Sequence, residues 1–303
     1  MAKVAFVYPG QGSQQPGMGA ELLTDPEVAD LCDQCASAAG VDLRHLLTTA
    51  GDEELRLTQN AQPALCFVGL GLTLLLRRRG IEPVAAAGHS VGEYAALAAS
   101  GAVGAPHVIK AVVERGKAMA DAAPAGTSSM AAVLGLSSQA VEAALAGMND
   151  AWPANYNTPT QTVIAGTTAG LEAATKRLQA AGAKRVVPLN VSAAFHTPLM
   201  APAAEHLRAA LDRIEWRAPR IPVMANLTGR PHQGGDRIPQ VMGMQLRSPV
   251  RWAACVLMLV ELGCDAFVEV GPKRALTGMM RELAATATAA AVGTPDAVEQ
   301  LTL

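Results

Sequence analysis

Residues 84–92 read VAAAGHSVG, a short apolar run that leads directly into the pentapeptide G-x-S-x-G. A strand that ends in a tight turn and continues as a helix lifts the central serine, Ser90, out of the backbone and exposes its hydroxyl. The residues after Val91 read as a helix start, so the first free N–H groups, above all that of Val91, would point toward an oxyanion formed there. The chain has 28 glycines, so a chance match is the alternative to a nucleophile.

A nucleophilic serine needs a base, and two histidines are candidates. His89 adjoins Ser90, but successive side chains leave a strand end on opposite faces, so we expect it to point away. His196 lies between the predicted strand 184–189 and a helix whose first turn is set by Thr197-Pro198. A histidine at such a junction can face across a cleft. A structural histidine with satisfied hydrogen bonds is the alternative.

A cation interrupts an apolar helix face. Arg115 lies in the middle of a stripe at helical spacing. Burying a guanidinium among apolar side chains costs several kcal/mol of folding free energy unless an anion pairs with it. The neighbouring Glu114 lies about 100° around the helix and cannot face the same way. Either a distant carboxylate pairs with Arg115 or a substrate anion binds it with two hydrogen bonds. The residues of the stripe are Val108, Ala111, Val112, Ala118, Met119 and Ala122.

The glycine-rich loop 10–17 follows the first predicted strand. It fails the dinucleotide fingerprint G-x-G-x-x-G because the third glycine would fall on Gln15. The loop better suits close approach of the backbone to a small group, with the N–H of Gln11 as a second oxyanion donor. Gln62, just before Pro63, is a weak signal by itself.

Short apolar runs alternate with helical patterns, which is typical of an α/β fold with a mostly parallel sheet covered by helices. The predicted strands are Lys3–Tyr8, Val84–Ala87, Pro222–Ala225 and Asp265–Val270. The predicted helices cover much of 63–79, 92–100, 106–122, 197–213, 250–262 and 274–283.

The middle third has a different pattern, β-α-β-β-α-β, which is the ferredoxin-like arrangement. Its strands are expected at 129–134, 151–157, 161–166 and 184–189, and its helices near 137–147 and 168–181. We therefore expect a ferredoxin-like subdomain, 127–193, inserted into a larger α/β domain made of 1–126 and 194–303.

The composition limits the function classes. With 303 residues, half of them apolar and 17% charged, the chain is expected to fold into one large domain or two ordinary ones. A formal charge of −2 and 3% aromatic residues argue against a nucleic-acid partner. The apolar start is interrupted too early, at Pro9-Gly10, for a signal peptide, and no apolar stretch approaches the roughly 18 residues that span a bilayer. We expect a cytoplasmic protein with no membrane partner.

The cysteines and histidines predict no metal or cofactor. Five cysteines show no disulfide-like spacing, and the C-x-x-C of Cys32 and Cys35 lacks a second pair. Buried, reduced thiols are expected instead. The six histidines are scattered along the chain.

Six segments, in this order, resemble the malonyl-CoA:acyl-carrier-protein transacylases, and the resemblance covers essentially the whole chain. The resemblance implies a hydrolase-like, mostly parallel sheet domain with a ferredoxin-like insert. One departure is Gly271-Pro272-Lys273, where the family often has Gly-Pro-Gly, and it leaves the local turn open. The six segments are Pro9–Gln14, Ala61–Leu65, Gly88–Tyr94, Arg115–Met119, Ala194–Met200 and Gln245–Trp252.

The resemblance also implies roles. Ser90 would attack the thioester carbonyl and His196 would accept its proton, while the backbone carbonyl of Gln245 orients the imidazole in place of an acid. Arg115 would hold the malonyl carboxylate. The N–H groups of Gln11 and Val91 would form the oxyanion hole, and Gln62 would contact the substrate. Phe195 would exclude a branch methyl, an effect of about 1–3 kcal/mol, with ordinary core packing as the alternative.

The implied reaction moves malonyl from malonyl-CoA to the phosphopantetheine thiol of an acyl carrier protein, through a malonyl-serine, in fatty acid biosynthesis. Open alternatives are a free-standing acyltransferase of a polyketide synthase, a serine thioesterase or acyl-editing hydrolase, and an inactive carrier-binding scaffold. The family suggests a monomer. Acyl carrier proteins are generally acidic, so basic clusters are docking candidates. These clusters are Arg77-Arg78-Arg79, Lys176-Arg177 and Lys184-Arg185.

Overall fold

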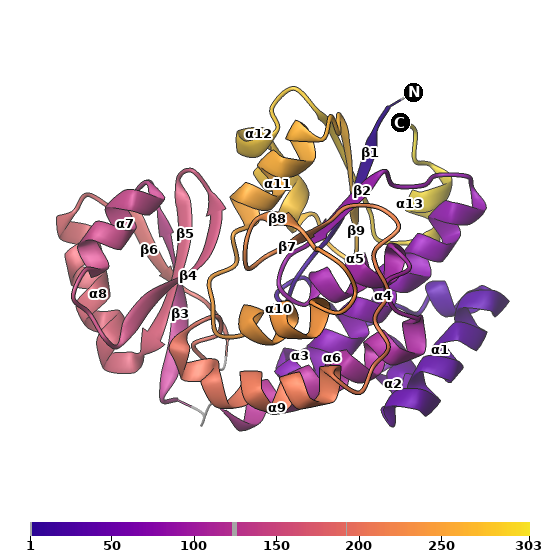
Figure 1. Ribbon diagram of the computed structural model, residues 1–303, viewed down its shortest axis with the longest axis horizontal. Helices are drawn as coiled ribbons and strands as arrows, with labels where there is room; N and C mark the ends of the chain where they lie inside the picture. The colour runs from indigo at the N-terminus through magenta and orange to yellow at the C-terminus, as the bar shows by residue number, and fades with distance from the viewer. Residues whose placement is uncertain (1, 123–125, 192) are drawn as a thin grey trace.

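Two β-sheets organise the chain, as Figure 1 shows for the computed structural model, which describes residues 2–122, 126–191 and 193–303. The first sheet has the order β10-β9-β1-β2-β7-β8, in which β8 alone runs antiparallel to its neighbour. This confirms the predicted mostly parallel α/β sheet. Its strands are β1 (Val4–Tyr8), β2 (Ala85–Gly88), β7 (Val223–Ala225), β8 (Arg230–Pro231), β9 (Ala266–Val270) and β10 (Thr288–Val292).

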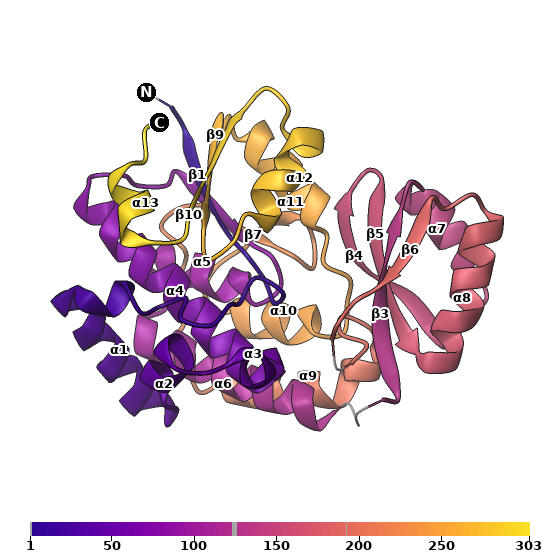
Figure 2. The ribbon, with the colours of Figure 1, turned by 180° about the vertical axis from the view of Figure 1, so that it is seen from behind.

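Helices cover both faces of this sheet (Figures 1 and 2). Alternate residues of β1 point to opposite faces, because side chains alternate along a strand. Phe6 and Tyr8 join the core that contains α4, whereas Ala5 and Val7 join the core of α11 and α12. Being buried on both faces, the strand reads as a continuous apolar run. The helices that pack around this sheet include α4 (Thr58–Arg78), α5 (Gly92–Ala99), α6 (Ala105–Asp121), α11 (Trp252–Glu261) and α12 (Ala275–Leu283).

Several elements of the large part were not predicted. One of them, α1, carries clear signals: the carboxylate of Asp25 caps its first N–H groups, Pro26 opens it, and Gly40 ends it at φ 63°. β10 is a partly exposed edge strand and therefore lacks the buried apolar run. The helices that were not predicted are α1 (Pro26–Ala39), α2 (Leu43–Thr48), α3 (Asp52–Arg56), α10 (Ile238–Gln245) and α13 (Pro295–Glu299), with the short 3₁₀ helix η1 (Leu22–Thr24). The predicted helix 197–213 is confirmed as the 3₁₀ helix η2 (Pro198–Met200) followed by α9 (Ala201–Leu211).

Helix α4 corrects one expectation. With 21 residues it is long and apolar enough, by length and composition alone, to cross a membrane, whereas no such stretch was expected. However, 83% of its most apolar window is buried inside the protein. Close contacts fix it there: an added Cβ at Gly69 would lie 3.0 Å from the ring of Tyr8. α4 is the central core helix of the large part, which is why it is apolar on all sides.

The second sheet is antiparallel, with the order β4-β5-β3-β6, and its element order β-α-β-β-α-β confirms the ferredoxin-like prediction. Two helices cover one face (Figures 1 and 2) and share a core with it. The sheet meets the large part where Val250 exchanges backbone hydrogen bonds of 2.8 Å with Ala154 and Tyr156. Domain limits at 127 and 193 remain our proposal, and residue 192 lies outside the described residues. The elements are β3 (Ser128–Leu134), α7 (Ser138–Leu145), β4 (Ala151–Thr158), β5 (Gln161–Thr167), α8 (Thr168–Ala180) and β6 (Arg185–Pro188).

Candidate functional site

The pentapeptide forms a sharp strand–turn–helix elbow at the carboxyl end of β2. Ser90 adopts φ 53°. Among the described non-glycine residues only Ser90 and His196, at φ 61°, have positive φ, a conformation that costs free energy unless the surroundings enforce it. Such strained residues often lie at functional sites, so the backbone alone singles out these two.

The two glycines of the pentapeptide are required by close backbone contacts. A Cβ at Gly88 would lie 1.9 Å from the carbonyl carbon of Gly92, and a Cβ at Gly92 would lie 2.2 Å from the carbonyl oxygen of Tyr8 in β1. The elbow can therefore turn this tightly only because neither position has a side chain.

Gly88→Ala is accordingly expected to lower the free energy of unfolding by more than about 4 kcal/mol, because backbone atoms would have to move. Thermal and urea unfolding measure the change. Gly278→Ala is the matched control, because nothing lies within 4 Å of a Cβ there and alanine favours its helix. Equal stability of the two variants would contradict the crowded elbow.

Asn226, just after β7, holds the elbow from the neighbouring strand. Its Oδ1 accepts a hydrogen bond from the N–H of Ser90 at 2.7 Å, and its Nδ2 donates to the carbonyl of Gly88 at 2.7 Å. The sequence reasoning missed this residue. It could have been found, because it directly follows the predicted strand 222–225, and the carboxyl ends of neighbouring parallel strands meet at one edge.

Ser90 and His196 lie in contact. Ser90 Oγ is 2.8 Å from His196 Nε2, and His196 Nδ1 is 3.0 Å from the backbone carbonyl oxygen of Gln245. Because a carbonyl can only accept, Nδ1 carries the proton and Nε2 is free to accept the one from Ser90. Burial, and then the charge of Arg115, lowers the pKa of His196 to about 3, so the imidazole is neutral near pH 7.

Arg115 reaches the same point from α6 and is almost fully buried. Its Nη2 donates to Ser90 Oγ at 3.0 Å and to Gln245 Oε1 at 3.1 Å, and its Nη1 donates to Gln62 Oε1 at 2.5 Å. Within the described residues no carboxylate forms an ion pair with it. Its Nε has no partner there either. A buried cation that meets only neutral oxygens can still accept an anion.

A chain of hydrogen bonds leads from Arg115 to the loop after β1. Gln62 Nε2 donates to Thr58 Oγ1 at 2.6 Å, and Thr58 Oγ1 donates to Gln11 Oε1 at 2.8 Å. Thr58 was not singled out from the sequence, although it lies one helical turn before Gln62. The chain connects the guanidinium to the loop that was expected to supply an oxyanion donor.

Two backbone N–H groups are free at the predicted oxyanion positions. In the ranges that the structure describes, neither Gln11 N nor Val91 N donates a hydrogen bond. The N–H of Val91 lies at the start of α5, where the helix leaves its first donors unpaired. Both groups can therefore serve an incoming oxyanion.

The remaining sequence candidates lie around this centre. His89 points away from Ser90, as expected: its Nε2 is 2.9 Å from Asn157 Oδ1 and its ring lies 5.5 Å from that of Trp252. Phe195 is buried in the large apolar core beside His196. At the departure from the Gly-Pro-Gly pattern, Lys273 Nζ donates to the carbonyl of Gly12 at 3.2 Å, next to Gln11.

The cysteines belong to the core, and one of them, Cys255, places its Sγ 3.9 Å from Asn226 Nδ2 beside the elbow. All five are free and buried, as expected, and burial raises the pKa of Cys32 to about 11 and of Cys35 to about 12. Over residues 2–122, 126–191 and 193–303, no group of three or more His, Cys, Asp and Glu side chains is placed to hold a metal ion.

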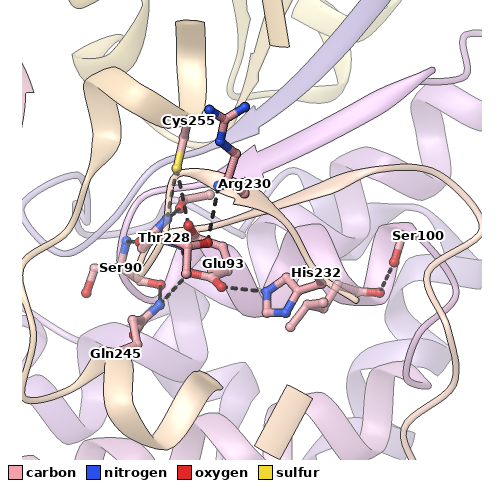
Figure 3. A network of polar contacts seen from close by, with 12 residues as sticks. Ser90, Glu93, Ser100, Thr228, Arg230, His232, Gln245 and Cys255 are labelled. Atoms are coloured by element: carbon pink, nitrogen blue, oxygen red, sulfur yellow. Dashed lines mark hydrogen bonds and ion pairs between the residues drawn. The ribbon is translucent and has the colours of Figure 1, made fainter. Parts of the chain in front are cut away.

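Glu93, the first acidic residue after the pentapeptide, is fully buried beneath the elbow (Figure 3). Its Oε1 lies 2.7 Å from His232 Nε2. Its Oε2 accepts from the N–H of Asn226 at 3.0 Å and from Gln245 Nε2 at 2.7 Å. No sequence pattern connects Glu93 with His232, which lies 139 residues away.

Comparison with known proteins gives consistent matches along the whole chain. Residues 5–297 match the model of the acyl transferase domain family. The malonyl CoA-acyl carrier protein transacylase of Bacillus subtilis (strain 168) is 37% identical over 304 residues, which cover 99% of this chain and 96% of the relative.

Solved structures agree with this match. An acyl carrier protein S-malonyltransferase from Vibrio cholerae superposes with a TM-score of 0.95 at 36% identity, over 99% of this chain and all of that one. A malonyl-transacylase solved in complex with a type II polyketide synthase acyl-carrier protein gives a TM-score of 0.93 at 37% identity, over 98% of each chain.

Proposed function

Because the chain belongs to the acyl transferase family, as a malonyl-CoA:acyl-carrier-protein transacylase, we propose that Ser90, His196 and Arg115 carry its reaction. The supporting observation is the position of one buried guanidinium. Arg115 lies 3.0 Å from the candidate nucleophile and has no carboxylate partner among the described residues. A nucleophile, a neutral base and a cation without an ion-pair partner therefore meet at one point.

In the first half-reaction, Ser90 Oγ attacks the thioester carbonyl carbon of malonyl-CoA while its proton passes to His196 Nε2. The N–H groups of Gln11 and Val91 stabilise the oxyanion of the tetrahedral intermediate. The carbon–sulfur bond then breaks, and His196 returns the proton to the departing thiolate. The products are coenzyme A and malonyl-Ser90.

The second half-reaction runs the same steps in reverse. The phosphopantetheine thiol of the carrier protein gives its proton to His196 Nε2 and attacks the ester carbonyl. Ser90 Oγ leaves and recovers the proton from His196. Throughout, the carbonyl of Gln245 holds Nδ1, so the imidazole stays in one tautomer and orientation.

The choice of acyl group rests on Arg115, with Gln62 beside it. The malonyl carboxylate would accept hydrogen bonds from the guanidinium, which the amide oxygens of Gln62 and Gln245 hold in place. An acetyl group would leave the buried cation without an anion, and a site built for a charged group discriminates strongly against its absence. Phe195 is proposed to exclude a methyl branch.

The partners are malonyl-CoA and a phosphopantetheinylated acyl carrier protein. Fatty acid biosynthesis is the proposed pathway and polyketide synthesis the alternative, because the polyketide-associated structure and the other relatives resemble this chain about equally. A monomer in the cytoplasm is proposed as well. No cofactor is needed for these steps.

One candidate docking cluster is unfavourable for the carrier protein. Arg77, Arg78 and Arg79 end α4, and Arg78 lies roughly 24 Å along the helix from Gln62. Their charges are also paired, with Asp25, Glu27, Glu82 and Glu299. We therefore propose docking on the side of Lys176-Arg177 or Lys184-Arg185, on the α8 and β6 layer.

Intact-mass spectrometry tests the function. After mixing with malonyl-CoA, the protein is expected to gain one malonyl group, which the carrier protein then removes onto its own thiol. Ser90→Ala is expected to gain none. Rapid release of free malonate without carrier protein would favour a hydrolase instead. An undiminished adduct in Ser90→Ala would reject the nucleophile.

A further inference from the structure

The buried carboxylate of Glu93 takes no part in the proton transfers described above, yet three donors converge on it. Two of them belong to groups that hold the site. Asn226 holds the elbow at the carbonyl of Gly88 and the N–H of Ser90, and Gln245 supplies the carbonyl that orients His196. The Glu93 carboxylate therefore contacts the supports of both catalytic side chains, and Figure 3 shows it between Gln245 and His232.

The side-chain amide of Gln245 bridges Glu93 and Arg115. Its Oε1 accepts from Arg115 Nη2 at 3.1 Å, while its Nε2 donates to Glu93 Oε2 at 2.7 Å and to the carbonyl of Ser90 at 3.1 Å. A guanidinium can only donate, and a carboxylate or carbonyl can only accept. The amide therefore has one workable orientation, and Glu93 helps to set it.

This orientation matters for the acyl group. If the amide turned over, its NH₂ would face the guanidinium, donor against donor, and Arg115 would have to move. Because Arg115 also reaches Ser90 Oγ, such a movement displaces the cation from the malonyl position.

We propose that Glu93 is a positioning residue for malonyl selectivity, acting through the Gln245 amide on Arg115, with His232 fixing its other oxygen. The inference rests on the proposed function of Arg115. In this proposal the Glu93 carboxylate acts on the Arg115 guanidinium through one neutral side chain, that of Gln245.

The test compares loading of Ser90 by malonyl-CoA and by acetyl-CoA, followed by intact mass at several concentrations. Glu93→Met removes the acceptor at similar length and is expected to lower the malonyl-to-acetyl ratio of kcat/KM by roughly tenfold, chiefly through a higher KM for malonyl-CoA. Glu93→Gln keeps one amide oxygen for Gln245 and is expected to retain part of the ratio.

A double-mutant cycle separates positioning from general damage. Gln245→Met removes the bridge but keeps the backbone carbonyl that holds His196. In that background, Glu93→Met is expected to change the ratio by less than about twofold. If Glu93→Met does not fold, Glu93→Gln is compared with its Gln245→Met double variant in the same way.

Glu269→Met is the matched control. This carboxylate is also fully buried, but it caps the start of α12, accepting from the N–H groups of Leu276 and Thr277. Its loss is expected to lower the melting temperature and leave the ratio unchanged.

Two results would overturn the proposal. One is an unchanged ratio in Glu93→Met, including the case in which loading by both acyl groups falls equally. The other is that the effects of the two single variants multiply in the double variant. Failure of the wild-type protein to form any malonyl adduct would instead reject the proposed function, before the variants are compared.

Discussion

Arg115→Ala is expected to lower kcat/KM for malonyl loading by roughly 10²–10³-fold while loading by acetyl-CoA stays the same or rises. Removing one partner of a buried charged pair costs about 3–5 kcal/mol, because the malonyl carboxylate would then be buried without its cation. The acetyl group has no carboxylate to lose. In the wild-type site it leaves a buried guanidinium unpaired, and the variant removes that penalty.

Arg217→Ala is the matched control, because this arginine side chain is 70% exposed and, in the described ranges, pairs only with Glu215. Loading rates for both acyl groups should stay within about twofold of the wild-type values, since exposed ion pairs contribute little. If Arg115→Ala kept the malonyl preference, the cation would have a structural role and another group would recognise the carboxylate.

The elbow could be predicted from the sequence because its requirements are local. An apolar strand, two glycines that exclude a Cβ and a helix start occur within a few consecutive residues. The same holds for Arg115, whose isolation on an apolar stripe is visible from helical spacing alone. The spacing did not identify its partner. In the structure its hydrogen bonds go to the oxygens of Gln62, Ser90 and Gln245, all neutral, and its guanidinium lies 5.8 Å from the ring centroid of Tyr94.

The supports of the site could not be predicted in this way. Asn226 and Gln245 reach Ser90 across 136 and 155 residues of chain, and no periodic pattern links positions so far apart. Gln245 was found only through the family resemblance. His232 was read as one of several scattered histidines, because a single partner such as Glu93 leaves no signature in sequence.

The elements of the fold also divide into those that a local sequence pattern predicts and those that depend on tertiary contacts. The central strands β1, β2, β7 and β9 are buried apolar runs, so each was predicted to within about two residues. The edge strand β10 and the short helices α2, α3 and α13 depend on tertiary contacts more than on local pattern. The helix 63–79 was predicted, but α4 starts five residues earlier, at Thr58, so its apolar length was underestimated.

His196→Ala is expected to lower acyl transfer by about 10²–10⁴-fold, the contribution of a positioned general base. The wild-type pH profile reports the same group. The base must be neutral to act, so kcat/KM falls as the pH drops through its pKa in the free enzyme. Burial and Arg115 hold that pKa near 3. Loading at pH 5 should therefore equal loading at pH 7.5 within about twofold, whereas a histidine with the ordinary pKa of about 6.5 would lose roughly thirtyfold.

The experiment needs a control variant and a pH range in which the protein stays folded. His206→Ala, with a 64% exposed side chain, should leave the rate unchanged. Below pH 6.5 His196 is protonated in the unfolded chain but stays neutral in the folded protein, where it is buried. The free energy of unfolding therefore falls as the pH drops towards 3. Rates are therefore compared only where circular dichroism shows the folded protein. A thirtyfold loss in the folded protein at pH 5 would mean that the pKa of His196 is close to the ordinary value and that burial and Arg115 do not hold the imidazole neutral. The identity of the base is tested separately, by His196→Ala.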